Sequence, residues 1–226
     1  MFSFKCNTLI NAQLAGSLQS LTVTRPDIAF ATNVICQHMH APTTYDHQLL
    51  KRLLRYIKGT LHYGLPLSKG ELKLTTYSDA DWAADMDERK FVSGFCTYLG
   101  SNLILWSVKK QATVARSSTE AEYRALAAAT SDVLWLRRLM ADFHVPRSQA
   151  TSIFCDNIST LTLAHNPVFH ARTKHIEIDH HFISDRIRHN TIDVSHISSL
   201  DQPADILTKP LSATRFSSLR DKLTIC

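Results

Sequence analysis

Four acidic residues stand at the edges of apolar segments and are candidates for one shared cation site. Asp79 lies in YSDADW, Glu122 in TEAEYRAL, Asp156 in IFCDN and Asp205 in DQPADILTK. A soluble domain normally keeps its carboxylates on the surface, so acids beside buried segments need a partner. Oxygen ligands suit hard cations such as Mg²⁺, and two such ions can clamp a phosphodiester. The four acids therefore predict metal-assisted chemistry on a phosphate ester.

Glu122 is a better candidate than Glu120, although both belong to one expected helix over residues 118–143. Ser117 and Glu120 match a capping box, which gives Glu120 a structural role at the helix start. Glu122 lies instead on the apolar stripe of the helix. The other members of that stripe, at offsets of four, seven and eleven, are Leu126, Ala129 and Val133. A buried carboxylate there needs a cation or a nearby Arg, and both alternatives stay open.

Asp79 and Asp156 each follow an apolar run that is expected to be a strand, over residues 72–78 and 152–155. Ligands of open α/β sheets collect at the carboxyl ends of strands, so the two acids meet if these strands are neighbours. Asp81 lies on the same face of the first strand and competes with Asp79. Asp156 is also a candidate N-cap of the following helix, and capping is compatible with metal binding.

The character of the chain changes near residue 70. Residues 13–63 have the apolar spacing of helices, and residues 65–70 indicate a linker. Beyond the linker, strands and helices follow one another in an order that predicts a mixed sheet flanked by helices. The expected strands are residues 72–78, 95–99, 103–108, 152–155 and 192–197, with a hairpin turn at 100–102. The expected helices there are residues 118–143, 157–165, 174–189 and 201–208.

The composition is that of a globular protein with a small positive net charge. Apolar residues make up 44% of the 226 positions, and the net charge is +5. This excess of Lys and Arg favours an anionic partner only weakly. The five Cys are widely spaced without a CxxC pair, which indicates free thiols. No apolar run reaches the roughly 18 residues that would span a bilayer, so we expect no membrane association and no secretion.

Three long segments carry a specific pattern: YSDADWA, SGFCTYLGSNLILWSVKKQ and ARSSTEAEYRALAAATSDVLWLRRL. The pattern continues in order through IFCDN, RTKHIEIDHHFI and residues 196–209. Together they closely resemble the ribonuclease H domain of copia-type retrotransposon polyproteins. Upstream, LLKRLLRYIKGTLHYGL resembles the region that joins reverse transcriptase to ribonuclease H in plant-type elements. We therefore expect an unmatched segment at 1–12, a helical connection segment at 13–70 and a ribonuclease H-like domain at 71–226.

The resemblance implies a five-stranded mixed sheet flanked by helices, of the ribonuclease H class. It assigns the metal-binding and catalytic acids to Asp79, Glu122, Asp156 and Asp205. It also places a histidine that assists proton transfer or product release at His196. The order Asp, Glu, Asp, Asp differs from the Asp, Asp, Glu order of retroviral-type integrases.

The same resemblance implies hydrolysis of the RNA strand of RNA–DNA hybrids with two Mg²⁺ ions, for which Mn²⁺ can substitute. Lys109, Lys110 and Arg116 are the candidate contacts to the phosphate backbone, because phosphates dominate the affinity for nucleic acids. A solvated strand end is the alternative for Lys109 and Lys110. Further expectations are a partnership with the reverse transcriptase portion of a polyprotein, and a location in cytoplasmic virus-like particles or the nucleus.

Other features limit these expectations. No paired-aspartate polymerase motif occurs, so we expect no DNA synthesis. Residues 89–92 replace the small polar residues of the family with bulkier ones. His175, His180 and His181 lack the spacing of a helical zinc pair and are interpreted as packing residues. A catalytically silent remnant that binds nucleic acid or a partner is the alternative function.

Overall fold

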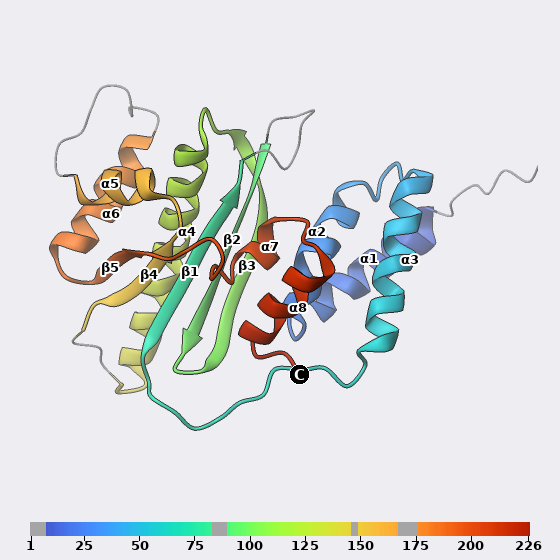
Figure 1. Cartoon of the computed structure of the whole chain (residues 1–226), viewed down its shortest axis with the longest axis horizontal. Coiled ribbons are helices and arrows are strands. Elements are labelled where there is room, and N and C mark those ends of the chain that lie inside the picture. The colour runs from blue at the N-terminus through green and yellow to red at the C-terminus, as the bar shows by residue number, and fades with distance from the viewer. Residues whose placement is uncertain (1–7, 83–89, 146–148, 167–175) are drawn as a thin grey trace, which may run out of the picture.

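A five-stranded mixed sheet forms the centre of the computed structural model, which describes residues 8–82, 90–145, 149–166 and 176–226 (Figure 1). The strand order is β3-β2-β1-β4-β5. β1 to β3 are antiparallel neighbours, whereas β4 is parallel to both β1 and β5. The strands are β1 Leu74–Asp81, β2 Lys90–Leu99, β3 Asn102–Val114, β4 Thr151–Cys155 and β5 Ile192–His196. This arrangement confirms the expected fold class, a mixed α/β sheet.

Helices cover both faces of the sheet. One face packs against α4 (Ser118–Asp142), α5 (Ile158–His165) and α6 (Glu177–Arg188). The other face packs against α7 (Asp205–Thr208) and α8 (Ala213–Lys222). The buried cluster on the α4 side includes Leu126, Val133, Ile153, Ile183 and Val194, and the opposite cluster includes Cys96, Tyr98, Leu207, Leu219 and Leu223. These two apolar layers fix the sheet between the helices.

The N-terminal helices form a small bundle beside the sheet (Figure 1). They are α1 (Thr8–Leu21), the 3₁₀ turn η1 (Pro26–Ile28), α2 (Ala29–Gln37) and α3 (Thr44–Gly59). Leu18, Ile28, Ile35, Leu50 and Leu53 make its core. α1 begins at Thr8 and therefore crosses the boundary expected at residue 12. α2 also reaches the sheet, because Ala29 belongs to the same buried cluster as Cys96. The division of the chain at residue 70 stays a prediction.

A buried ion pair organises the small bundle. Arg25 Nη2 lies 2.7 Å from Asp27 Oδ2, and Arg25 Nη1 donates to the Thr60 carbonyl at 2.8 Å. Tyr56 donates its hydroxyl proton to Asp27 at 2.7 Å. The aromatic ring of Tyr56 also contacts Phe216 of α8, edge to face at 5.6 Å between centroids. These contacts hold the helices of the bundle together and attach the bundle to α8.

The linker after α3 is attached to the sheet domain by backbone hydrogen bonds. The Gly64 N–H donates to the Cys226 carbonyl at 2.9 Å, and the Cys226 N–H returns a bond to Gly64 at 3.3 Å. The Gly100 N–H donates to the Lys73 carbonyl at 2.8 Å. Gly100 has φ +61°, which suits the turn of the expected hairpin between β2 and β3. The linker therefore follows a defined path into β1.

Several elements differ from their expected extent. β2 begins at Lys90 and β3 continues to Val114, so the hairpin is longer than the apolar runs suggested. α7 is a single turn, and α8 was not expected. The bulky residue Phe91 is accommodated, because it is fully buried against four alanines. These are Ala80, Ala115, Ala121 and Ala125.

Gly94→Ala is expected to lower stability by about 1–3 kcal/mol, because there is no room for a Cβ atom between β2 and α7. An added Cβ would lie 2.8 Å from Thr208 Cγ2 and 2.9 Å from Leu207 Cβ. Urea unfolding measures the loss. Gly16→Ala is the control, since its added Cβ meets nothing within 4 Å and should leave stability equal or higher. Equal stability of the Gly94 variant and the wild type would contradict this packing.

Candidate active site

Asp79 is the most buried of the four acids. It lies near the carboxyl end of β1, and its side chain has no exposed surface. Thr208 Oγ1 donates to Asp79 Oδ2, and Lys209 Nζ donates to Asp79 Oδ1 at 2.8 Å. Burial, opposed by the Lys209 charge and reinforced by Asp205, raises the pKa of Asp79 to about 6. The competing candidate Asp81 stands at the last position of the strand, outside the carboxylate groups described below.

Asp205 is the first residue of α7 and faces Asp79 across the end of the sheet. Lys209 Nζ lies 2.7 Å from Asp205 Oδ1, an (i, i+4) pair on one side of the single turn. Arg215 Nη2 contacts Asp205 Oδ2 at 3.1 Å. α7 reaches this position because Gly94, opposite Asp79 in the β1–β2 register, has no side chain. The absence of a Cβ at Gly94 therefore permits the close approach of Asp205.

Asp156 follows β4 directly and meets Asp79 as expected. β1 and β4 are parallel with Tyr77 opposite Phe154, so both acids lie two residues beyond that pair. Ser199 Oγ donates to Asp156 Oδ2 at 2.7 Å. The alternative role as N-cap is wrong, because Asn157 caps α5 and accepts the Thr160 N–H at 3.0 Å. The Asp156 side chain is thereby available to the acidic cluster.

Glu122 enters the cluster from the other face of the sheet, through α4. Its side chain is buried, and the Ala80 backbone N–H donates to it. Burial, followed by the charges of Asp79 and Asp156, raises the pKa of Glu122 to about 9. Among the residues that the structure describes, no Arg or Lys forms a salt bridge with Glu122. The open alternative of an Arg partner finds no support there.

Glu120 has the structural role expected of it, with a different geometry. Ser117 Oγ accepts the Glu120 N–H at 3.2 Å, as an N-cap should. The Glu120 carboxylate, however, accepts the N–H of Arg116 at 2.7 Å and pairs with Arg124 at 2.9 Å. The reciprocal bond to Ser117 that a capping box requires is replaced by these two contacts.

The acids form two overlapping groups. Within each group, one ligand atom of every member lies within 4.8 Å of those of the other members. The first contains Asp79, Asp156 and Asp205, and the second contains Glu122, Cys155 and Asp156. Burial, with Glu122 nearby, raises the pKa of the Cys155 thiol, so this thiol stays protonated and is a poor ligand for a hard cation. Asp156 is common to both groups. The donor set therefore consists of carboxylate oxygens, which fit Mg²⁺ or Mn²⁺.

His196 lies beside this cluster. It is the last residue of β5, its side chain is exposed, and it is paired in register with Cys155. Asp156 follows Cys155, so His196 stands one strand away from the shared acid. This placement is compatible with the expected role in proton transfer or product release.

The three candidate phosphate contacts lie at the same end of the sheet as Asp79. Gly94 pairs with both Asp79 and Val108. Lys109 follows Val108 and therefore stands two strands away from Asp79, about 10 Å across the sheet. Lys109 and Arg116 are exposed, and Lys110 is half-buried. Because strand residues alternate in direction, Lys109 and Lys110 point to opposite faces.

The other singled-out residues have packing roles. His180 is buried, stacks on Tyr123 at 6.3 Å between centroids, and contacts the Asn166 carbonyl at 3.2 Å. His181 contacts the His180 ring edge to face. His175 lies outside the described residues. In the part of the chain that the structure covers, neither His180 nor His181 belongs to a candidate metal group.

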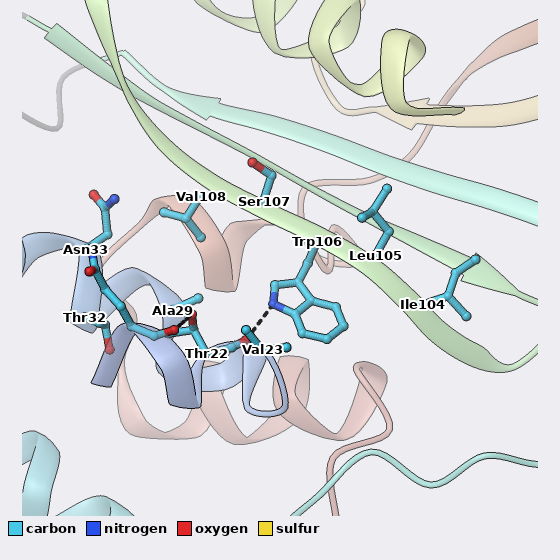
Figure 2. A pocket seen from close by; sticks show the side chains of 11 residues that line it. Thr22, Val23, Ala29, Thr32, Asn33, Ile104, Leu105, Trp106, Ser107 and Val108 are labelled. Carbon is cyan, nitrogen blue, oxygen red and sulfur yellow. Dashed lines mark hydrogen bonds between the residues drawn. The ribbon is translucent and has the colours of Figure 1, made fainter. Parts of the chain in front are cut away.

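A hollow of about 510 Å³ lies between α1, α2 and the outer strand β3 (Figure 2). Trp106 points into it and donates its indole N–H to the Thr22 carbonyl at 2.9 Å. This indole bridges the helical bundle and the sheet, and it packs against the buried cluster around Leu207. None of the four acids lines this hollow. We therefore place the candidate active site at the carboxylates and not in the hollow.

Sequence reasoning missed the cations that neutralise the acids. Lys209 and Arg215 both contact Asp205, and Lys209 also contacts Asp79. The spacing of Asp205 and Lys209 is an (i, i+4) signal that could have been read from ADILTK. Although partial burial opposes its charge, the two carboxylates raise the pKa of Lys209. The ammonium therefore remains charged within the site.

Comparison with known proteins shows clear sequence similarity to Pol polyproteins. The chain is 47% identical over 213 residues to the retrovirus-related Pol polyprotein from transposon RE1 of Arabidopsis thaliana, across 94% of the chain. The chain is homologous to plant copia-type Pol polyproteins. The corresponding polyprotein from transposon TNT 1-94 of Nicotiana tabacum is 34% identical across 91% of the chain. The chain covers only 14% and 16% of these two relatives, about one seventh of their length.

Comparison with family models and with solved structures adds little to this Pol homology. No family model matches the chain. The ribonuclease H1 named LC11, solved in complex with an RNA/DNA hybrid, is 17% identical with a TM-score of 0.44. That comparison covers 60% of this chain and 94% of LC11. The fold assignment rests on the strand order itself. None of the described helices has the length and apolar character needed to cross a membrane.

Proposed function

We propose that this Pol-related chain is a metal-dependent endonuclease that hydrolyses the RNA strand of RNA–DNA hybrids. The observation that carries the proposal is the pair of overlapping carboxylate groups that share Asp156 at one end of the sheet. Carboxylates from β1, α4, the residue after β4 and α7 converge there, and burial together with the charges of Asp79 and Asp156 raises the pKa of Glu122. A converging set of this kind needs bound cations, or protons on some of its members, to be stable, and cations allow all of its carboxylates to ionise.

Two Mg²⁺ ions, or Mn²⁺ in their place, are the cofactors that this donor set would hold. The ligands would be Asp79, Glu122, Asp156 and Asp205, whose oxygens are of the type that Mg²⁺ prefers. That the site accommodates positive charge follows from Lys209, whose ammonium already contacts two of the acids. When bound, the ions supply activation of a water and neutralisation of the leaving oxygen.

The remaining residues of the site orient the substrate and move protons. His196 is exposed beside Asp156, where its imidazole would be placed to transfer a proton to or from the reacting groups. Lys109, Lys110 and Arg116, at the same end of the sheet as the acids, would contact phosphates of the hybrid. The acids at the ends of β1 and β4, with the cations they would hold, lie between these two sets of groups.

A second candidate is a catalytically silent module that binds nucleic acid or a protein partner. The observation favouring it is the network of Asp79, Lys209, Asp205 and Arg215, in which two of the acids are paired with side-chain cations. The partners we propose for either function are RNA–DNA hybrid and the reverse transcriptase portion of a Pol polyprotein. The proposed location is the cytoplasm, in virus-like particles, or the nucleus.

Cleavage of a 5′-labelled RNA–DNA hybrid separates these two candidates. With Mg²⁺ we expect cuts in the RNA strand only, and none in the DNA strand, in duplex DNA or after chelation. The matched substrates are the same sequence as duplex DNA and as duplex RNA. A well-folded protein that binds the hybrid without cutting it in Mg²⁺ or Mn²⁺ would sink the nuclease proposal and support the silent module.

Lys109→Ala is expected to weaken hybrid binding and to reduce the dependence of log affinity on log salt by about one unit. The reason is the loss of one phosphate contact near the cluster. Fluorescence anisotropy at several salt concentrations, with the metal chelated, measures both quantities. Lys73→Ala is the control, because this exposed residue precedes β1 at the opposite end of the sheet. The same salt dependence in both variants would show that Lys109 does not contact the backbone.

A further inference from the structure

The ammonium of Lys209 occupies the space between two of the proposed metal ligands. Its Nζ lies 2.8 Å from Asp79 Oδ1 and 2.7 Å from Asp205 Oδ1. The same two carboxylates, with Asp156, form the first of the two candidate cation groups. A divalent ion held by Asp79 and Asp205 would therefore take the position that the ammonium now has.

Removal of this ammonium would be costly in the metal-free protein. Asp79 is fully buried and its described partners besides Lys209 are the hydroxyl of Thr208 and its acidic neighbours. Breaking a buried ion pair by removing one partner leaves an uncompensated charge, which destabilises a protein far more than an exposed pair would. Lys209 thus holds the end of β1 and α7 together before any metal binds.

The same ammonium must move away when a metal ion arrives. A cation at hydrogen-bond distance from both oxygens repels a second cation placed between them. Its side chain is 32% exposed, whereas those of Asp79 and Asp205 are 0% and 9% exposed. A Lys on a flexible four-carbon stem can swing toward solvent or toward a substrate phosphate, while the buried acids stay in place.

We propose that Lys209 is the resident counter-ion of the site, which stabilises the metal-free fold and competes with divalent ions for Asp79 and Asp205. This inference rests on the proposed metal-dependent function, and it adds a residue that regulates occupation of the same site. Lys209 acts through the ligands as a positioning residue. Its removal therefore has opposite effects on two quantities: stability without metal falls, and affinity for metal rises.

The test is Lys209→Gln in the full chain, with Mn²⁺ as the probe. Isothermal calorimetry measures the Mn²⁺ dissociation constant, and thermal unfolding in EDTA measures metal-free stability. We expect the variant to bind Mn²⁺ about tenfold more tightly, which lies within the usual range for the coupling of two binding events. We also expect its melting temperature in EDTA to be lower, and its gain in melting temperature on adding Mn²⁺ to be larger than that of the wild type.

Lys222→Gln is the matched control. Lys222 Nζ also lies 2.7 Å from a carboxylate, that of Asp201, and its side chain is similarly exposed at 36%. This variant should have the wild-type affinity for Mn²⁺. Tighter binding by the Lys209 variant alone supports the counter-ion role, including the case in which the wild type binds no measurable Mn²⁺. Unchanged, weaker or absent binding by the Lys209 variant overturns it.

Hybrid cleavage by the wild type separates this inference from the proposed function. Cleavage together with unchanged Mn²⁺ affinity in the Lys209 variant would leave the nuclease proposal standing and remove the counter-ion role. Tighter Mn²⁺ binding by the variant without any cleavage would support the counter-ion role and remove the nuclease proposal.

Discussion

Asp79→Asn is expected to reduce metal-dependent cleavage of an RNA–DNA hybrid by at least about a thousandfold, equivalent to several kcal/mol of transition-state stabilisation. Asp79 is the buried acid at the end of β1 and belongs to the carboxylate group that includes Asp156 and Asp205. The amide keeps the size of the side chain and can accept the hydrogen bond from Thr208, but it removes the charge that pairs with Lys209 and that would hold a cation. Because Lys209 keeps Asp205 as a partner, we expect the rate of cleavage to fall much further than the stability of the fold.

Asp81→Asn is the matched control, because Asp81 lies two residues on in the same strand and outside the carboxylate groups. Single-turnover cleavage at saturating enzyme measures the chemical step for both variants, and circular dichroism verifies that both are folded. We expect the Asp81 variant to retain cleavage within about tenfold of the wild type. An Asp79 variant that cuts as fast as the Asp81 variant would remove Asp79 from the site.

Glu122→Gln is expected to abolish most of the pH dependence of metal-free stability between pH 6 and pH 9. The pKa of Glu122 is raised from 4.5 to about 9, so the native protein holds a proton that the unfolded chain releases. Stability is then greatest below the unfolded pKa and is lost as pH rises toward the folded pKa. The pKa of Asp79 is raised to about 6, so this residue adds a similar loss of stability, but only at lower pH.

In EDTA, the wild type should lose at least about 2 kcal/mol, or roughly 5 °C in melting temperature, between pH 6 and pH 9. The Glu122 variant should stay nearly level over this range, since Gln has no proton to release. Saturating Mg²⁺ should also flatten the wild-type profile, because bound cations favour the ionised acid. Glu120→Gln, two residues earlier in α4, should keep the wild-type slope. A wild-type stability that is constant or rises from pH 6 to pH 9 would contradict the assigned burial of Glu122.

The sequence alone predicted much of the scaffold of the site. The alternation around Asp79, the apolar stripe of α4 and the short run before Asp156 are strong local patterns, and each matches an element of the structure. The meeting of Asp79 with Asp156 depended only on β1 and β4 being parallel neighbours, which they are. Long periodic segments specify their own structure, and strand order then brings their ends together.

Other features depend on contacts between distant segments and were not predictable locally. Asp156 and Asn157 are equally good N-caps by type, and only the turn geometry selects Asn157. The end of β3 is polar, and its pairing with β2 decides its strand structure. α8 has few apolar residues and is fixed by burial of Leu219 under the sheet. Lys209 acquires its position only when α7 docks beside Gly94.

The position of Mn²⁺ in crystals of the wild-type protein grown with saturating MnCl₂ tests the central claim most directly. An anomalous difference map identifies the ion without reference to activity. We predict a peak within coordination distance of Asp79, Asp156 and Asp205, with the Lys209 ammonium displaced from both of its carboxylate partners. A map with no peak at these acids, and with Lys209 still between Asp79 and Asp205, would contradict the proposed metal-dependent function.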